Sequence, residues 1–244
     1  DLEDIKVTLR MEREATGTRM SRIVETPAGT LHDRIFQPAA DAGYGSNPNP
    51  HWEERLVKGP DDLAAVAYLI PQSKPEDYVD VAAIQREVGE RALVNLYINS
   101  AIDHGVGWGM DLADLMLNSL DRPQFLRDFL ALFHKSCLNK TQAALEAGMK
   151  VIFTPWYFVS MSAGWSPKFY KEFILPLVKE QVQLVHGMGG IHHYYDDGKC
   201  GAILTWLAEA EIDVLSTFPP PPTGFRSATS PIASAIPNTR RRSG

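Results

Sequence analysis

The sequence is poor in cysteine, in long apolar runs and in positive charge. Its 244 residues include only two cysteines, Cys137 and Cys200, which do not form a C-x-x-C pair. A disulfide framework is therefore excluded, and a reducing compartment is indicated. No apolar run approaches the roughly 20 residues that a membrane-spanning helix needs. The formal net charge of −6 argues against a nucleic-acid surface, which is usually basic. We therefore expect a soluble, cytoplasmic protein that binds neither nucleic acid nor a membrane.

Two nucleotide-binding signatures are also missing. Neither G-x-G-x-x-G nor G-x-x-x-x-G-K-[ST] follows any of the short apolar runs of the chain. A dinucleotide-binding fold and a P-loop fold are therefore disfavoured. The remaining composition, with 44% hydrophobic and 22% charged residues, is that of an ordinary globular protein.

An alternating pattern is present near the N-terminus. Val7, Leu9 and Met11 alternate with polar residues, which is the two-residue period of a β-strand. A turn at residues 15–18 separates this stretch from a second extended one at residues 20–26. The pattern predicts an antiparallel hairpin.

From about residue 92 the pattern changes to strands that alternate with helices. The predicted strands lie at residues 92–98, 150–154, 191–195 and 212–218, and a glycine-rich loop is expected at residues 105–109. Pro176 is expected to kink the helix that contains it. Strands separated by helices, without hairpin turns, are typical of a parallel sheet. We therefore predict an α/β protein that forms a partial (β/α)8 TIM-type barrel with an N-terminal antiparallel hairpin excursion.

The end of the chain has a different character. After Gly224 the residues are small, polar or basic and show no helical or strand period. We therefore predict an incomplete barrel domain at residues 1–224 and an irregular tail at residues 225–244. The tail is either naturally disordered or a non-native sequence that replaced the rest of the barrel. The second interpretation is favoured because about four parallel strands cannot close a barrel.

Several stretches resemble the uroporphyrinogen decarboxylase superfamily. They are residues 26–31 (TPAGTL), 57–63 (VKGPDDL), 164–176 (GWSPKFYKEFILP), 195–199 (YDDGK) and 212–215 (IDVL). The resemblance covers roughly residues 26–224. The resemblance implies a (β/α)8 barrel. The superfamily includes the decarboxylase of haem synthesis and cobalamin-linked methyltransferases.

The resemblance suggests a reaction and a cofactor. In the methyltransferases, zinc is bound by a His-x-Cys pair and a later cysteine. At the matching positions this chain has Tyr195 and Asp197, so a zinc site is not supported. The leading hypothesis is methyl transfer that involves a corrinoid, a cofactor carried by a partner corrinoid protein. The alternatives are decarboxylation of a porphyrinogen, which is a lyase reaction of porphyrin synthesis, and a non-catalytic truncated remnant. The expected substrate is a small molecule or a tetrapyrrole.

Polar residues cluster where the predicted strand 191–195 ends. His193, Tyr195, Asp196 and Asp197 lie there, and active sites of such barrels are found at the carboxyl ends of the strands. A histidine, a phenol and carboxylates are suited to general acid–base catalysis. The alternative is that the residues after Tyr195 form a solvated turn.

Two further loops carry candidate residues. Asn99, Asp103 and His104 follow the first parallel strand, with His104 predicted to be catalytic and Asn99 to contact a cofactor. Trp156, Tyr157 and Trp165 flank the loop after the second parallel strand and are predicted to stack on a flat macrocycle. The alternative for these tryptophans is that they cover one end of the barrel.

Overall fold

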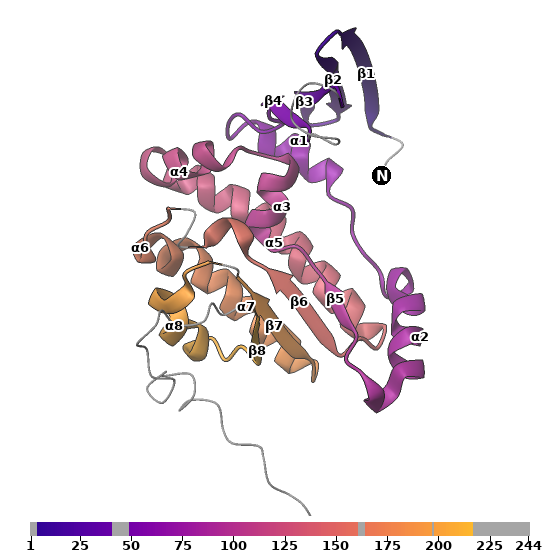
Figure 1. Cartoon of the computed structure of the whole chain (residues 1–244), viewed down its shortest axis with the longest axis vertical. Coiled ribbons are helices and arrows are strands. Elements are labelled where there is room, and N and C mark those ends of the chain that lie inside the picture. Colours follow the sequence, from indigo (N-terminus) through magenta and orange to yellow (C-terminus); the bar gives the residue numbers. More distant parts are fainter. Residues whose placement is uncertain (1–3, 41–48, 161–163, 197, 217–244) are drawn as a thin grey trace, which may run out of the picture. The chain divides into compact units, whose positions relative to one another are not determined.

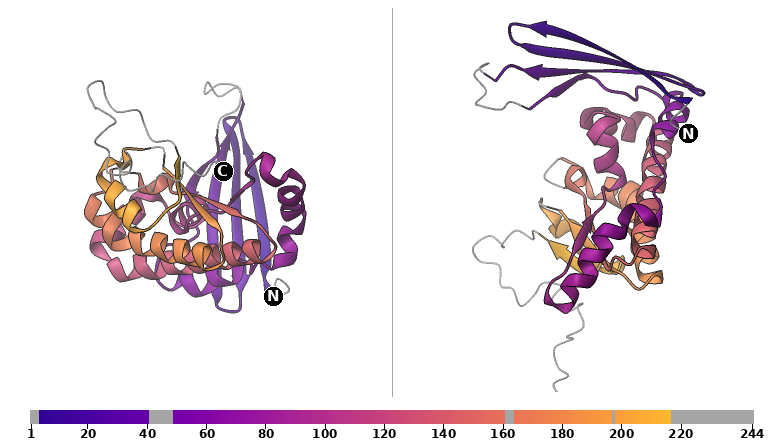
Figure 2. Two further views of the ribbon diagram at one scale, coloured as in Figure 1. Left: turned by 90° about the horizontal axis from the view of Figure 1, so that it is seen from below. Right: turned by 90° about the vertical axis from the view of Figure 1, so that its right-hand side faces the viewer.

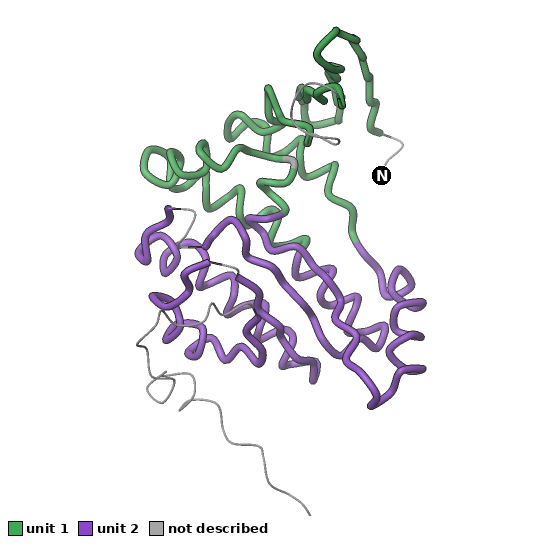
Figure 3. Tube along the Cα trace, viewed as in Figure 1, with its two compact units in different colours: residues 1–72, 104–136 green, residues 73–103, 137–244 purple. Residues whose placement is uncertain are grey.

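The computed structural model describes residues 4–40, 49–160, 164–196 and 198–216. The chain divides into two compact units, which Figure 3 shows in different colours. The first unit comprises residues 1–72 and 104–136, and the second comprises residues 73–103 and 137–244. The predicted tail at residues 225–244 lies outside the described residues.

The first unit contains a four-stranded antiparallel sheet with the strand order β1-β2-β3-β4 (Figure 2). Its strands are β1 (Lys6–Glu14), β2 (Gly17–Thr26), β3 (Gly29–Pro38) and β4 (His51–Glu54). Two-residue turns connect the first three strands, so Glu14 pairs with Gly17 and Thr26 pairs with Gly29. The predicted hairpin is therefore confirmed, and a third and a fourth strand extend it.

The two faces of this sheet differ in chemistry. The register places Val7 opposite Val24 and Val24 opposite Leu31, so one face is mainly apolar. Val24 and Leu31 are buried, and helix α1 (Asp62–Leu69) packs on β3. On the opposite face, Arg19 and Arg34 both form ion pairs with Glu53 of β4. Burial on one side and ion pairs on the other stabilise the central strands, whereas β1 is exposed along its whole length.

The glycine-rich stretch of the first unit is helical. Helix α3 (Ala101–Trp108) includes Gly105 and Gly107, so the expectation of a loop at residues 105–109 is wrong. A Cβ atom at Gly105 would lie 2.5 Å from Cε1 of Phe129 in α5 (Pro123–Glu146). The glycine therefore allows two helices to pack closely, and this gain offsets its low helix propensity. Helix α4 (Leu112–Asp121) lies between them in the sequence.

The second unit contains a parallel sheet. Its strands are β5 (Asn95–Tyr97), β6 (Val151–Pro155), β7 (Ile191–Tyr195) and β8 (Val214–Ser216), and they neighbour one another in this order. All three pairings are parallel, as the alternation of strands and helices predicts. Among the described residues β5 and β8 pair with no further strand, so the sheet is open and a closed barrel is not confirmed.

Helices cover one face of the parallel sheet (Figure 1). Ile98 and Ile152 pack in a core cluster with Ala82 of α2 (Val79–Val88), Leu145 of α5 and Val185 of α7 (Leu175–Gly187). On β6 and β7, Ile152 and His192 point to this face, whereas Phe153, His193 and Tyr195 point to the other one. The helices therefore bury one face, and the half-buried aromatic residues line the opposite face.

Pro176 affects the helix before it, as the sequence predicts. The segment begins as α6 (Pro167–Phe169), continues as a π-helical turn, η6 (Tyr170–Ile174), and becomes α7 with Pro176 in its first turn. Proline lacks the N–H group that an α-helix requires at an interior position, so the hydrogen-bond pattern shifts at this point.

The remaining elements are short. They are η2 (Pro75–Tyr78), η3 (Gly89–Arg91), η4 (Tyr157–Val159), η7 (Cys200–Ile203) and α8 (Leu204–Glu209). In the part of the chain that the structure describes, no helix is both long and apolar enough to span a membrane.

Candidate functional site

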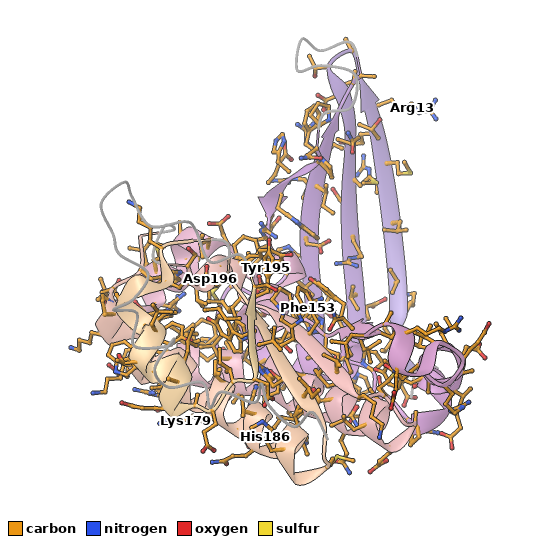
Figure 4. The ribbon with its side chains drawn as sticks, turned by 60° about the horizontal axis from the view of Figure 1, so that its bottom comes forward. Arg13, Phe153, Lys179, His186, Tyr195 and Asp196 are labelled. Carbon is orange, nitrogen blue, oxygen red and sulfur yellow. The ribbon has the colours of Figure 1, made fainter. Side chains whose placement is uncertain are left out.

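The carboxyl ends of β5, β6 and β7 bring polar residues together in the second unit. Because the strands are parallel, residues that follow different strands meet at the same end of the sheet. We call this group the carboxyl-end cluster, and its members are Tyr97, Asn99, Asp103, Tyr157, Tyr195 and Asp196. Figure 4 labels Tyr195 and Asp196 at this end of β7, whereas His186, which precedes β7, is labelled at the other end.

Asp103 is the titratable group of the cluster that is poised near neutral pH. It is only 6% exposed, and burial raises the pKa of its carboxyl group to about 7. The hydroxyl group of Ser100 and the backbone amides of Phe158 and Tyr157 act to lower this pKa, while the charge of Asp196 raises it further. The Ser100 hydroxyl donates a short hydrogen bond to Asp103 Oδ2. A carboxyl group with this pKa exchanges a proton readily at physiological pH.

Asp196 is the second carboxylate of the cluster. Its side chain is fully buried, and its Oδ1 atom accepts a hydrogen bond of 2.8 Å from the backbone N–H of Gly198. Its charge also helps to raise the pKa values of Cys200 and of the phenols Tyr170 and Tyr194, for which burial is the main cause. The buried carboxylate therefore adds to the effect of burial, and both favour the protonated forms of these groups.

Three tyrosines belong to the cluster, and one of them, Tyr97, interacts with Asp103. The Tyr97 hydroxyl donates a 2.7 Å hydrogen bond to Asn99 Oδ1, and burial together with the charges of Tyr157 and Asp103 raises the Tyr97 pKa. The rings of Tyr157 and Tyr195 meet at 5.0 Å. Tyr97 and Tyr157 are 51% and 37% exposed. The site therefore combines buried acids with aromatic rings that a ligand can reach.

His193 lies farther from the carboxyl end than the sequence suggests. Its ring contacts Asn95 Oδ1 at 3.3 Å through Nδ1 and the Ser216 hydroxyl through Nε2. Partial burial lowers its pKa. It shares a face with Tyr195, and the ring of Phe153 lies 4.9 Å from His193 and 5.5 Å from Tyr195. The catalytic role predicted for His193 therefore requires a substrate that extends from the carboxyl-end cluster along this face of the sheet to His193.

The neighbouring His192 has a structural environment. It is fully buried on the helix-covered face, and burial lowers its pKa to about 3. Its Nε2 atom lies 3.3 Å from Gln181 Oε1, and the Gln181 amide donates to Thr141 and Thr154. This chain of hydrogen bonds joins α5, α7 and β6. We therefore assign His192 a structural role in the packing of the second unit.

Both predicted cofactor-stacking tryptophans are buried. Trp156 stacks on Tyr194 at 6.0 Å, and Trp165 stacks on Phe169 at 3.7 Å. Trp156 is 0% exposed and Trp165 is 7% exposed. Their role towards a cofactor stays a prediction, and this placement favours the alternative that they cover one end of the sheet.

The last predicted residues are placed differently again. His104 belongs to the first unit, where its ring contacts Phe133 edge-on at 5.0 Å. Asp197 lies outside the described residues. Tyr157 was predicted together with the two tryptophans as a ring that could stack on a macrocycle, and its partial exposure leaves that prediction open. Tyr97 was not predicted, although its position at the end of a strand was the signal that could have identified it.

The first unit has a cavity of its own. Its volume is about 450 Å³, and it is lined by residues of both charges, including Arg55, Asp111, Asp114 and Arg122. None of the predicted site residues lines it. We therefore place the candidate site in the carboxyl-end cluster and not in this cavity.

Metal ligands do not gather in the described part of the chain. Among these residues no group of three or more histidine, cysteine or acidic side chains is placed to hold a metal ion. Both cysteines are buried. The expectation that zinc is not bound tightly stays a prediction, and metal analysis can test it.

Comparisons with known proteins show a similarity in fold to a solved structure. No family model matches the sequence, and no curated protein matches it. The solved structure of a methyltransferase from Methanosarcina mazei is similar, with a TM-score of 0.51 and 15% identity. The match covers 70% of this chain and 50% of that chain, so this chain spans about half the length of that protein. At this identity the likeness shows the fold alone, and membership of the uroporphyrinogen decarboxylase superfamily is not confirmed.

Proposed function

We propose that this protein is a methyltransferase whose reaction site is the carboxyl-end cluster, with Asp103 as the proton donor and acceptor. The observation that carries the proposal is the Asp103 carboxyl group, which is buried at the carboxyl end of a parallel sheet with a pKa of about 7. A perturbed carboxylic acid in such a position is a strong candidate for catalysis. The similarity in fold to a methyltransferase supports the reaction class.

Methyl transfer from a neutral donor leaves a basic atom that takes up a proton. When a methyl group leaves an oxygen, nitrogen or sulfur atom, its bonding electrons stay on that atom. The atom therefore becomes more basic as the carbon–heteroatom bond breaks. The protonated form of Asp103 donates its proton to this heteroatom as the methyl group leaves. In the reverse reaction, the ionised form of Asp103 removes a proton from the heteroatom that accepts the methyl group. The charge of Asp196 favours the protonated form of Asp103 at the start of the reaction.

The same end of the sheet suits a flat cofactor. Tyr97 and Tyr157 present partly exposed rings beside the two carboxylates, and such rings favour stacked or edge-on contacts with a planar group. We propose that they contact a corrinoid carried by a partner protein. A corrinoid supplies the cobalt centre that gives or accepts the methyl group. The residues of this chain bind the small-molecule substrate, exclude water and hold the proton on Asp103.

A methyl-transfer assay with spectral detection tests this proposal. The purified chain is mixed with reduced cobalamin and with a methoxylated aromatic, a methylamine or a methyl thioether as the methyl donor. We expect methylcobalamin to form with at least one donor, and we expect Asp103→Asn to slow its formation by about 10²–10⁴-fold. Asp80→Asn is the matched control, because Asp80 is an exposed carboxylate of the same unit.

Three outcomes would contradict the proposal or its assignment of Asp103. Release of carbon dioxide from uroporphyrinogen, without any methyl transfer, would support the decarboxylase alternative. An unchanged cobalamin spectrum with every donor, for a chain with native circular dichroism, would support a non-catalytic protein. Equal rates for Asp103→Asn and the Asp80→Asn control would remove Asp103 from the mechanism.

A further inference from the structure

Among the residues that the structure describes, strand β1 is a long edge strand with an uncovered apolar row. It spans nine residues at the outer side of the antiparallel sheet, and every one of them is exposed. Val7, Leu9 and Met11 share one face and are 52%, 67% and 62% exposed. An edge of this length offers unpaired main-chain N–H and C=O groups to another strand.

The main-chain groups at the free edge belong to the same three residues. Glu14 and Gly17 flank a two-residue turn, so they form a hydrogen-bonded pair of the hairpin. In an antiparallel ladder, alternate residues direct their N–H and C=O groups to the same neighbour. The even-numbered residues of β1 therefore face β2, and Val7, Leu9 and Met11 offer their groups to a new strand.

We propose that β1 pairs antiparallel with β1 of a second copy of this chain, in a register centred on Leu9. Leu9 then lies opposite Leu9 of the second copy, and Val7 lies opposite its Met11. On the other face, Lys6 lies opposite Glu12 and Thr8 lies opposite Arg10. Two sheets of four strands join into one continuous sheet of eight. This association is independent of the reaction proposed above.

Charge complementarity selects this partner and this register. A register centred on Arg10 would place two arginines opposite each other, and one centred on Met11 would place Leu9 opposite Arg13. In the register centred on Leu9, the apolar residues Val7, Leu9 and Met11 pair with one another and Lys6 pairs with Glu12, which are favourable cross-strand pairs. Thr8 lies opposite Arg10, so residues 6–12 place no like charges opposite each other. Charges on an edge strand normally discourage association, but in β1 their order matches an inverted copy of itself.

The charges involved are available for a partner. Within one chain, Lys6 pairs with Glu25 and Arg10 pairs with Glu12, each at 2.9 Å. The side chains of Lys6 and Arg10 are 75% and 77% exposed. Exposed ion pairs of this kind contribute little to stability, so exchanging them for pairs with a second copy costs little.

Sedimentation velocity of the full chain over a range of concentrations tests the proposal. We expect a dimer at high concentration that dissociates on dilution. Leu9→Glu places two like charges opposite each other at the centre of the register and weakens dimerisation by about tenfold or more. Leu120→Glu is the matched control, because Leu120 is an 81% exposed leucine of α4 and lies outside the paired strand. Circular dichroism checks that both variants are folded.

A charge exchange tests the register itself. Lys6→Glu alone and Glu12→Lys alone each create two like-charge pairs across the interface, so both should weaken dimerisation. The double variant Lys6→Glu with Glu12→Lys restores opposite charges and should recover dimerisation. A chain that is monomeric at every concentration overturns the proposal, as does a dimer that is unaffected by Leu9→Glu. A double variant as weak as the single variants overturns the register.

Discussion

Strands β1 and β6 each carry three large apolar residues, in nine and in five positions, but their environments are opposite. Every residue of β1 is exposed, whereas four of the five residues of β6 are buried. The difference arises because helices α2, α5 and α7 pack on one face of the parallel sheet, while β1 lies at the outer side of its own sheet. The apolar pattern of the sequence therefore predicts that a segment is a strand. The elements that pack against the strand decide whether its side chains are buried.

The two sheets also differ in how their registers are determined. In the antiparallel sheet, two-residue turns fix the pairings of β1 with β2 and of β2 with β3. In the parallel sheet, each pairing joins strands separated by a long crossover. Long connections leave the register to tertiary packing, so functional residues that follow the parallel strands meet only after the whole unit has folded.

The largest predicted effect concerns the pH dependence of stability at Asp103. Its pKa rises from 3.8 in the unfolded chain to about 7 in the folded protein. The folded state therefore binds an extra proton between these values, and the free energy of unfolding falls as the pH rises through this window. The loss is roughly 4 kcal/mol at most. We expect Asp103→Asn to lack this loss. As the pH rises from 5 to 8, the free energy of unfolding of Asp103→Asn, measured with urea, should therefore increase relative to that of the wild type.

The control for this titration comes from the antiparallel sheet. Glu25 is an exposed carboxylate of β2, so Glu25→Gln should follow the pH dependence of the wild type. Parallel curves for Asp103→Asn and the wild type would show that Asp103 is not buried as described.

The second prediction contrasts the cores of the two sheets. Ile152 of β6 is 0% exposed in the core cluster of the second unit. We expect Ile152→Ala to lower the free energy of unfolding by about 3 kcal/mol, because it removes buried surface and leaves a cavity. Leu9→Ala in β1 should change it by less than about 0.5 kcal/mol, since Leu9 is 67% exposed. Chemical denaturation of the two variants measures both values, and equal losses would remove the contrast between the sheets.

The third prediction tests the glycines of α3 in the first unit. A Cβ atom at Gly105 would lie 2.5 Å from the ring of Phe129, whereas at Gly107 it would meet nothing within 4 Å. Gly105→Ala should therefore destabilise the protein by about 1–3 kcal/mol. Gly107→Ala should stabilise it by up to about 1 kcal/mol, because alanine is the better helix former. Thermal denaturation of both variants distinguishes close packing from a flexible loop, in which both changes would be nearly neutral.

The smallest predicted effect is that of metal removal. We expect dialysis against a chelator to leave the thermal midpoint and the circular dichroism of the protein unchanged. The reason is that Tyr195 occupies the position at which the resemblance implies a zinc-binding histidine, and the cysteines are buried. One equivalent of zinc retained through dialysis would contradict this expectation.

Much of the local structure was predictable from the sequence. The alternation of Val7, Leu9 and Met11 indicated the first hairpin, and the apolar run at Ile152 indicated a strand of a parallel sheet. Pro176 indicated the irregular helix before α7. The glycine-rich stretch was misinterpreted because a glycine that admits a neighbouring ring has the same sequence signal as a glycine in a loop.

The candidate site was predictable only in part. The sequence placed Asp103 and Asp196 after two parallel strands, and this position follows from chain connectivity. It indicated Tyr157 as a candidate stacking ring, but it did not identify Asp103 as the residue poised near neutral pH, nor Tyr97 as an accessible ring. It also could not show that Trp156 is stacked on Tyr194 and buried.

The sequence by itself determined many of the strands and helices, including the first hairpin and the parallel strands, because side-chain periodicity and turn residues act over a few neighbouring positions. Only the tertiary structure decided that the carboxyl group of Asp103 is buried beside the amides of Tyr157 and Phe158 and the charge of Asp196. The physical reason is that the pKa of a group depends on desolvation and on nearby charges. Here the amides follow β6 and the charge follows β7, whereas Asp103 itself follows β5, and folding alone brings them together.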